Sequence, residues 1–324
     1  MNVLTLLKGV AGDLKRVESR IADEVASNIG MLDEMAKHPL HAGGKRLRPA
    51  MVLLSAKPYD YNVDRLLAVA AAIELMHMAT LVHDDVIDSA CLRRGHPTVN
   101  SHWGDKLSVL TGDYLFARAV SMVSADYENR LIKILADGIA EICEGEIQQT
   151  ADTFRLSVHE DEYINRISKK TACFFRISCE VGGLLSGAPA EAVEALRQYG
   201  QKTGIAFQIA DDILDIMGTS GVTGKPVGSD LQGGVITLPV IHVLNNGTGP
   251  ELKQLIRKGP DGSLNNDHVA AALDLVKEGG GVSYALEKAR SFADEAIEGL
   301  RVLPDGMAKE TLVDLANFFV DRDH

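Results

Sequence analysis

The stretch ELMHMATLVHDDVIDSACLRR, from Glu74 to Arg94, decides how the rest of this chain is interpreted. Its flanks are apolar and helix-like, yet its centre carries Asp84, Asp85 and Asp88. On a helix, the first and last of these carboxylates lie one turn apart on the same face, with Asp85 beside them. Buried like charges repel and lose hydration, so core packing does not explain the cluster. A divalent metal ion would reverse that balance.

The same Asp-Asp-x-x-Asp pattern recurs at Asp211, Asp212 and Asp215, again within an apolar helical segment. One such cluster alone is equally well explained as a solvated helix face, but its repetition in apolar surroundings favours a function. All six candidate metal ligands are carboxylates, which favour Mg²⁺, with Mn²⁺ as a substitute. Because Mg²⁺ shares its coordination with substrate phosphates, two facing clusters are typical of a diphosphate site.

Basic residues accompany both clusters. The segment GGKRLRP, residues 43–49, places Lys45 and Arg48 at a glycine turn before a helix, where backbone N–H groups and side chains suit a phosphate. Taken alone, this segment is also compatible with a solvated basic turn. Arg93 and Arg94 directly follow the first cluster. Further polar candidates are His77, Lys170, Thr171 and Lys225. A lone histidine on an apolar helix is usually a core residue, so His77 gains interest only from its neighbours.

Composition excludes several classes of protein. The formal net charge of −12 over 324 residues disfavours a nucleic-acid-binding protein. The four cysteines form no CxxC pair, so neither a zinc site nor a disulfide framework is indicated. The N-terminus lacks the order of regions found in signal peptides, and no run approaches about 18 uninterrupted apolar residues. We therefore expect a cytoplasmic protein without a transmembrane segment.

Helical periodicity runs along the whole chain, and the alternating pattern of strands is nearly absent. No linker of low complexity and no tandem repeat divides the sequence. These features predict a single all-α domain over residues 1–324, with ten or more helices. A glycine-rich loop at 218–234 follows the second cluster and contains Lys225.

Several motifs in a fixed order make the chain resemble the trans-isoprenyl diphosphate synthases, the polyprenyl synthetase family, over nearly its whole length. The motifs are GGKRLRP (43–49), LVHDDVIDSACLRRGHPT (81–98), GDYLFARA (112–119), EGEIQQ (144–149), KKTACFF (169–175), FQIADDILD (207–215) and GKPVGSDL with TLP (224–239). The resemblance implies a large helical bundle around a deep central cavity, usually as a homodimer.

The resemblance also implies roles for the site residues. Both aspartate clusters would bind Mg²⁺, as three ions when substrate is present. The residues implied to contact an allylic diphosphate are Arg93, Lys170, Thr171, Gln208 and Lys225. Those implied to hold isopentenyl diphosphate without metal are Lys45, Arg48, His77 and Arg94. The implied catalytic set is Asp84, Asp85, Asp88, Arg93, Lys170, Asp211, Asp212 and Lys225.

The implied reaction is a prenyl transfer. The allylic C–O bond ionises with the help of metal ions, and the double bond of isopentenyl diphosphate attacks the resulting cation. A proton then leaves, and the product is a longer all-trans polyprenyl diphosphate together with free diphosphate. The chain departs from the family pattern at Val235, where a lysine is common, and EGEIQQ carries Glu146 and Gln149 where short-chain members often have Gln and Asp.

Product length is predicted from Ala79 and Thr80, which lie about one helical turn below Asp84. These small residues leave room for a chain beyond fifteen carbons, and a medium or long product such as octaprenyl diphosphate is expected. The alternatives are a farnesyl or geranylgeranyl diphosphate synthase and a non-catalytic partner subunit that modulates product length. A terpene cyclase also uses aspartate-rich metal sites, but it usually lacks a segment like GGKRLRP.

Overall fold

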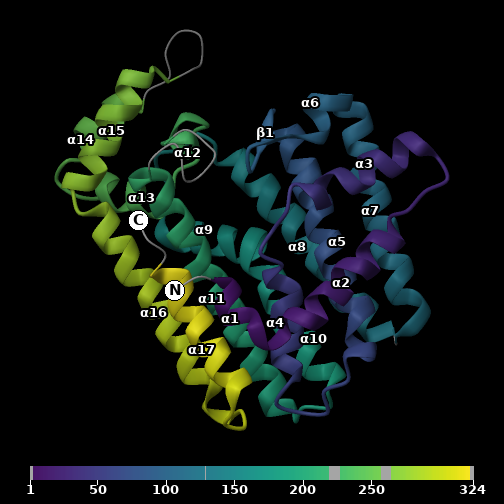
Figure 1. Cartoon of the computed structure of the whole chain (residues 1–324). Coiled ribbons are helices and arrows are strands. Elements are labelled where there is room, and N and C mark those ends of the chain that lie inside the picture. Colours follow the sequence, from purple (N-terminus) through teal and green to yellow (C-terminus); the bar gives the residue numbers. More distant parts are fainter. Residues whose placement is uncertain (1–2, 128, 219–226, 257–263, 322–324) are drawn as a thin grey trace. The chain divides into compact units, whose positions relative to one another are not determined.

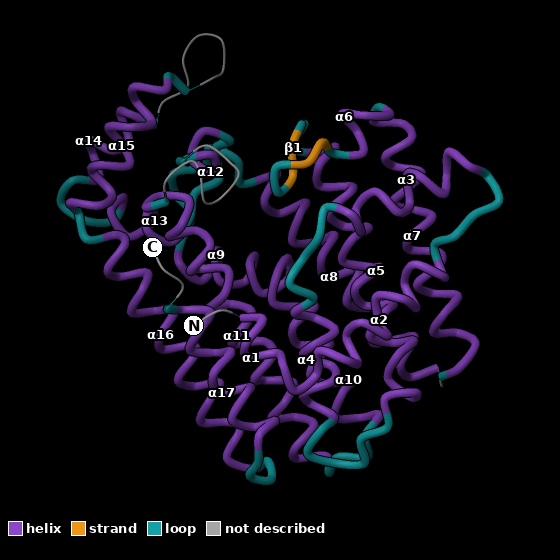
Figure 2. Tube along the Cα trace, in the orientation of Figure 1, coloured by secondary structure: helices purple, strands orange, loops and turns teal. Residues whose placement is uncertain are grey.

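The structure is a computed structural model, and it describes residues 3–127, 129–218, 227–256 and 264–321. Helices make up most of this part of the chain (Figure 2). Within the described residues, the only sheet is the antiparallel pair of β1 (Leu92–Arg93) and β2 (His96–Pro97). The prediction of an all-α fold is therefore confirmed.

The helices are labelled in Figure 1. Up to the strand pair they are α1 (Val3–Leu6), η1 (Leu7–Val10), α2 (Ala11–Glu24), α3 (Gly30–His41), α4 (Leu47–Ala56) and α5 (Val63–Ile87). Next come α6 (Val99–Trp103), α7 (Asp105–Asp126), α8 (Asn129–Ala151), α9 (Glu160–Ile167), η2 (Ser168–Ala172), α10 (Cys173–Leu185) and α11 (Ala190–Met217). The last are α12 (Ser229–Gln232), α13 (Leu238–Leu244), α14 (Gly249–Leu255), α15 (Asn266–Glu278), α16 (Gly281–Gly299), η3 (Leu300–Val302) and α17 (Met307–Val320).

The chain divides into two compact units. The first comprises Met1–Ile139, Phe174–Gly200 and Gly299–Leu315, and the second comprises Ala140–Cys173, Gln201–Glu298 and Ala316–His324. The two aspartate clusters therefore belong to different units, Asp84 to Asp88 to the first and Asp211 to Asp215 to the second. The prediction of one domain over the whole chain stays a prediction.

Helix α5 is the central element of the first unit. It packs most extensively against α7 and also contacts α2 and α4. Its buried residues lie on all sides between Leu66 and Val82, which is typical of a helix enclosed by others. The side chain of Asn62 accepts a hydrogen bond from the backbone N–H of Asp64 and thus caps the first turn.

By length and composition, α5 is the one helix among the described residues that could also span a membrane. Of its most apolar 18-residue window, 72% is buried within the protein, as in the core helix of a soluble protein. The absence of a transmembrane segment stays a prediction.

In the second unit, α13 packs against α9, α14 and α15. Between α9 and α10, the chain passes through η2, a π-helical turn that carries Lys170 and Thr171. Such turns are rare and occur often at functional sites. Helical periodicity alone did not predict this turn, so the change of helical pitch is a finding of the structure.

Candidate active site

Both aspartate clusters lie at the C-terminal ends of long helices. Asp84 and Asp85 belong to the last turn of α5, and Asp88 is its C-cap residue. Asp215 lies in the last turn of α11, with Asp211 and Asp212 one turn earlier. A helix C-terminus carries partial negative charge, so carboxylates are unfavourable there and cations are favoured. The position of each cluster therefore fits a bound cation better than it fits unassisted packing.

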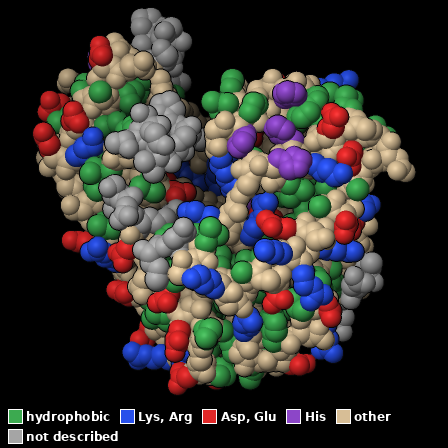
Figure 3. Space-filling model, in the orientation of Figure 1, with side chains coloured by type: hydrophobic (Ala, Val, Ile, Leu, Met, Phe, Trp, Pro, Cys, Tyr) green, Lys and Arg blue, Asp and Glu red, His purple; other side chains and the backbone are tan. Residues whose placement is uncertain are grey.

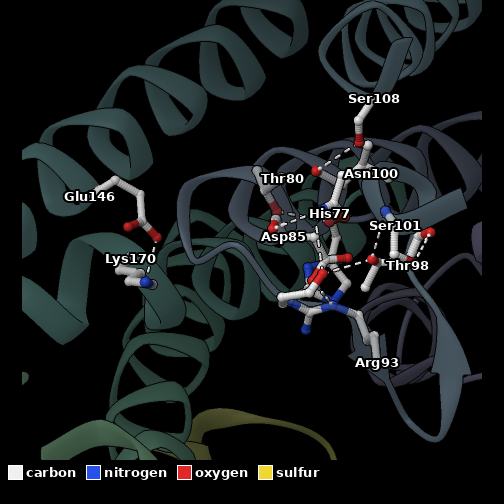
Figure 4. A network of polar contacts seen from close by, with 12 residues as sticks. His77, Thr80, Asp85, Arg93, Thr98, Asn100, Ser101, Ser108, Glu146 and Lys170 are labelled. Atoms are coloured by element: carbon white, nitrogen blue, oxygen red, sulfur yellow. Dashed lines mark hydrogen bonds and ion pairs between the residues drawn. The ribbon is translucent and has the colours of Figure 1, made fainter. Parts of the chain in front are cut away.

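Asp85 is the buried member of the first cluster, whereas Asp88 is exposed. The Oδ1 atom of Asp85 accepts a hydrogen bond from Nε of Arg93 at 2.8 Å and forms an ion pair with Nη2 of the same side chain at 2.7 Å. The amide of Asn100 donates to the backbone oxygen of Asp85 at 3.1 Å. These contacts fix the loop after α5, as Figure 4 shows. Arg93, predicted to contact a diphosphate, is thus held beside the first cluster by a carboxylate.

In the second cluster, Asp212 belongs to a buried chain of hydrogen bonds. Its Oδ1 atom accepts from Nε2 of Gln208, and its Oδ2 atom accepts from the hydroxyl of Tyr163, both at 2.7 Å. The hydroxyl of Thr171 donates to Oε1 of Gln208 at 2.7 Å. Three of the predicted residues are thereby brought together, and Tyr163 is an additional member that the sequence did not single out.

Burial dominates the electrostatics of Asp212. Loss of hydration and the nearby charge of Asp230 raise its pKa to about 8, although the bonds from Tyr163 and Gln208 oppose that shift. Burial likewise raises the pKa of Tyr163 well above its usual value. A neighbouring cation would favour the charged form of Asp212 and so lower this raised pKa. Asp230 was also missed as a site residue, although its motif GSDL was recognised.

Asp215 holds the beginning of α12. Its Oδ1 atom accepts hydrogen bonds from the backbone N–H of Ser229 at 3.1 Å and from the hydroxyl of Ser229 at 2.8 Å. Its Oδ2 atom accepts from the backbone N–H of Asp230 at 3.2 Å. Asp215 therefore has a clear structural role, and its role as a metal ligand stays a prediction.

Lys170 forms an ion pair with Glu146 of α8 at 2.5 Å (Figure 4). The two elements lie close together because α8 has a glycine at this point. A Cβ atom on Gly145 would lie 2.9 Å from the backbone nitrogen of Lys170. In the motif EGE, Gly145 thus allows η2 to pack closely against α8, and Glu146 pairs with Lys170 of η2. Lys225 lies outside the described residues.

One pocket lies within the first unit, between α3, α5 and the loop after α5. Its volume is about 490 Å³, including its open mouth. Its lining includes three of the predicted substrate-binding residues, His77, Arg93 and Arg94, together with Asp85. Arg46 and Glu74 also line it, and neither was assigned to a substrate from the sequence.

Lys45 and Arg48 flank the pocket residue Arg46 in the GGKRLRP segment. Lys45 is exposed, whereas the guanidinium of Arg48 lies 5.0 Å from the ring centroid of Phe175. The ring of His77 meets Phe174 edge-on, with centroids 6.1 Å apart. Loss of hydration and the charges of the neighbouring arginines, Arg48 first, lower the pKa of His77 well below its usual value. The pocket therefore holds a neutral histidine among arginines.

Histidines gather on the surface over α3 and α6 (Figure 3). His38 of α3 lines the pocket, and its Nε2 atom lies 2.7 Å from the backbone oxygen of Pro97. Its ring meets Trp103 edge-on, with centroids 5.1 Å apart. These contacts join the end of α3 to the strand pair and form one rim of the pocket.

The two residues predicted to control product length lie one turn before the first cluster on α5. Ala79 is fully buried, and Thr80 is half-buried. The hydroxyl of Thr80 donates a hydrogen bond to the backbone oxygen of His77 at 2.8 Å. Their role in product length stays a prediction.

Comparison with known proteins identifies the class. The sequence pattern of the family described as polyprenyl synthetase matches residues 29–276. A heptaprenyl diphosphate synthase component 2 from Geobacillus stearothermophilus is 40% identical, and the match covers 100% of both chains. An octaprenyl diphosphate synthase from Escherichia coli (strain K12) is 33% identical, again over 100% of both chains. Other relatives of similar identity are named as short-chain and geranylgeranyl diphosphate synthases.

The fold is also similar to solved structures. A polyprenyl synthase from Caulobacter crescentus CB15, complexed with calcium and isoprenyl diphosphate, matches with a TM-score of 0.94 and 34% identity. The match covers 99% of this chain and 98% of that one. The protein described here belongs to the polyprenyl synthetase family. It is a prenyltransferase with the helical-bundle fold of isoprenoid synthases, and both of these predictions are confirmed.

The residues present fit the divalent metal that this family uses to bind diphosphate. Within the described residues, no three His, Cys, Asp or Glu side chains are grouped as a complete metal site. The carboxylates of the two clusters suit an ion such as Mg²⁺, which takes one or two carboxylates from the protein and completes its coordination with water and substrate phosphates. The carboxylates at the two helix ends are the donors that such an ion prefers.

Proposed function

We propose that this chain condenses isopentenyl diphosphate with an allylic diphosphate and releases a longer all-trans polyprenyl diphosphate. One observation carries the proposal. His77, Arg93 and Arg94 line a single pocket, and the carboxylate cluster at the end of α5 adjoins it through Asp85. A phosphate-binding group of cations beside a set of metal-binding carboxylates suits a reaction between two diphosphates.

The metal is proposed to be Mg²⁺, three ions in the substrate complex, with Mn²⁺ as a substitute. The ligands are assigned to Asp84, Asp85, Asp88, Asp211, Asp212 and Asp215. The carboxylate chemistry and the helix-end positions support this assignment. The calcium in the solved relative from Caulobacter crescentus supports a divalent ion of the same hard type. When bound, these ions would neutralise the charge that develops on the departing diphosphate.

The side chains of the site then have distinct tasks. Arg93 and Lys170 stabilise the allylic diphosphate as its C–O bond breaks and the electron pair leaves with the diphosphate. In the structure each has a carboxylate partner, Asp85 and Glu146, which keeps it in place until an anion enters. Thr171 and Gln208 are assigned polar contacts with the same diphosphate. Lys225 is assigned to the same diphosphate from its motif alone.

The second substrate is assigned to the pocket of the first unit. Lys45, Arg48, His77 and Arg94 hold the diphosphate of isopentenyl diphosphate without metal and direct its double bond to the allylic cation. A new carbon–carbon bond forms, and the proton of the adjacent carbon is transferred to the released diphosphate. Apolar walls exclude water, which would otherwise trap the cation.

A medium or long product is proposed, such as heptaprenyl or octaprenyl diphosphate. Ala79 and Thr80 are small at the level where a bulky side chain would stop growth. The names of the relatives from Geobacillus stearothermophilus and Escherichia coli agree with this length. The relatives named as geranylgeranyl and short-chain synthases support the shorter alternative. Sizing the product made from farnesyl diphosphate and isopentenyl diphosphate separates the two.

A homodimer is proposed for the active enzyme. Helix α7 exposes Val109, Leu110 and Val120, which offer apolar surface to a second copy. One relative is named component 2 of a heptaprenyl diphosphate synthase. The alternative to a homodimer is therefore an assembly in which this chain needs a second, different chain for activity. Light scattering on the purified chain, followed by the prenyl-transfer assay on the same sample, tests both. An active dimer supports the proposal, whereas an inactive chain that gains activity from a second protein supports the alternative.

A further inference from the structure

The three cations of GGKRLRP are not equivalent. Arg46 is only 9% exposed and turns its guanidinium into the protein, whereas Lys45 is exposed. Nη1 of Arg46 donates to Oε1 of Glu74 at 3.1 Å, and its Nε donates to Oε1 of Glu18 at 3.0 Å. Nη2 also donates to the backbone oxygen of Leu40 at 3.4 Å. Arg46 therefore connects α5, α2 and the end of α3 to the beginning of α4.

The backbone of this turn depends on the same side chain. Arg46 is the N-cap residue of α4 and has φ 48° and ψ 41°, in the left-handed region that most side chains avoid. A strained conformation persists only where surrounding contacts over-determine it. The bonds to Glu74, Glu18 and Leu40 are those contacts. They fix the direction in which Lys45 and Arg48 leave the turn.

Glu74 lies between this turn and the substrate pocket. It is 4% exposed, lines the pocket, and stands one helical turn before His77 on α5. Its Oε2 atom is buried and has no hydrogen-bond partner. A buried carboxylate in a pocket for an anion is unfavourable unless nearby cations offset its charge.

A second arginine approaches Glu74 from the loop after α5. Nη1 of Arg94 donates to the backbone oxygen of Gly43. Burial lowers the pKa of Arg94, and the negative charge of Glu74 opposes that effect. A Cβ atom on Gly44 would lie 2.8 Å from Nη1 of Arg94 and 3.1 Å from Nη1 of Arg46. Two guanidinium groups thus meet at Gly44, and a side chain there would require the end of Arg94 to shift.

We infer that Arg46 and Glu74 are positioning residues of the isopentenyl diphosphate pocket. Arg46 neutralises Glu74 and holds the turn, so that the neighbouring cations, Lys45, Arg48 and Arg94, are presented to the diphosphate. Neither residue needs to contact the substrate. This inference rests on the proposed function, because it assumes that the pocket binds isopentenyl diphosphate.

Three variants separate this role from a general loss of stability. Arg46→Met removes the cation and leaves a bare carboxylate facing the diphosphate. Arg46→Lys retains the charge, but a single ammonium cannot replace a planar fork that serves three acceptors. The double variant Arg46→Met/Glu74→Gln removes both charges together. Arg118→Met is the matched control, because Arg118 forms a 2.6 Å ion pair with Glu24 between α7 and α2, outside the pocket.

Steady-state kinetics and direct titration with isopentenyl diphosphate give the test. We expect Arg46→Met to raise KM and Kd for isopentenyl diphosphate by about tenfold or more, with KM for the allylic substrate and kcat nearly unchanged. For Arg46→Lys, we expect KM and Kd for isopentenyl diphosphate to lie between those of Arg46→Met and those of the wild type. The double variant recovers much of the lost affinity, because no buried charge remains unpaired.

Equal changes for both substrates, or no recovery in the double variant, would overturn the inference. If Arg46→Met does not fold, the affinities of Arg46→Lys and of the double variant for isopentenyl diphosphate are compared with each other and with that of the wild type. Normal binding by all folded variants removes the inference and leaves the proposed function intact. Failure of the wild type and of Arg118→Met to bind isopentenyl diphosphate overturns both.

Discussion

The hydroxyl of Tyr163 donates a 2.7 Å hydrogen bond to Oδ2 of Asp212, and both side chains are almost completely buried. The other carboxylate oxygen accepts from Gln208. Asp212 is therefore oriented on both sides by protein groups. Pre-orientation of this kind is how proteins hold the groups around a metal, and outer contacts are often as sensitive to mutation as the ligands themselves.

Tyr163→Phe removes this hydrogen bond and keeps the ring. The Mg²⁺ concentration for half-maximal activity should rise by about tenfold, because an outer partner of a metal site is lost. The free energy of unfolding should fall by only about 1 kcal/mol, the net contribution of one buried hydrogen bond. Activity titrated with Mg²⁺ and thermal unfolding measure the two effects. An unchanged Mg²⁺ requirement would show that Tyr163 does not orient a metal-binding group.

The neutral state of His77 makes stability and binding depend on pH. Its folded pKa lies well below the usual 6.5, so the unfolded chain binds more protons as the pH falls through 6.5. Stability from this group is therefore complete above about pH 6.5 and is lost below it, at up to about 1.4 kcal/mol per pH unit. Denaturant unfolding of the wild type and of His77→Gln at several pH values measures this pH-dependent part of the stability. Its contribution to the difference between the two proteins should be absent at pH 8.

Binding of a diphosphate should reverse that shift. An anion beside the ring favours imidazolium, so isopentenyl diphosphate should bind with uptake of a proton near neutral pH. Calorimetry in buffers of different ionisation enthalpy reports the number of protons. Equal uptake by the wild type and by His77→Gln would show that the proton goes elsewhere.

Ala79→Tyr should shorten the product. The side chain of Ala79 is fully buried, so a phenol there must occupy space within the core of α5 and its neighbours. Overpacking costs about 1–3 kcal/mol, which requires that the variant first be shown to fold. Chromatography of the dephosphorylated products then gives the chain length. An unchanged length in a folded, active variant would contradict the placement of Ala79 on the product path.

Val235→Lys tests a departure from the family pattern. Val235 is partly exposed, and its backbone N–H donates to the oxygen of Asp230. A lysine there should lower KM for the allylic diphosphate by about threefold to tenfold, the effect of one added cation near a phosphate. Val235→Met adds a chain of similar length without charge and serves as the control. The same change in KM for both variants would mean that a positive charge at this position does not contribute to binding of the allylic diphosphate.

Much of the fold could be predicted because helical periodicity and alanine-rich segments report local structure. The aspartate clusters stood out because carboxylates are rare in apolar helices. The π-helical turn at Lys170 was missed, and it lies against Gly145 of α8, a contact between elements that local sequence does not report. The pairing of Arg46 with Glu74 was missed for a related reason. It joins residues on different elements, and no spacing rule connects them.

The structure also separates residues that the sequence treated alike. Asp84, Asp85 and Asp88 differ in burial, and Asp85 is paired with Arg93. Asp215 supports the start of α12, although its motif made it equivalent to Asp211. A repeated motif predicts a shared function, but it does not distinguish residues that bind a ligand from those that hold the site together.

The most direct test of the account is a product assay on the purified chain with Mg²⁺, farnesyl diphosphate and isopentenyl diphosphate, beside Asp84→Asn. The wild type should make all-trans polyprenyl diphosphates longer than fifteen carbons, only when both isopentenyl diphosphate and Mg²⁺ are present. The Asp84→Asn variant should fold and lose about 100-fold or more of that turnover. Product formed without isopentenyl diphosphate, or full turnover by the variant, would contradict the assignment of a metal-assisted chain-lengthening prenyltransferase.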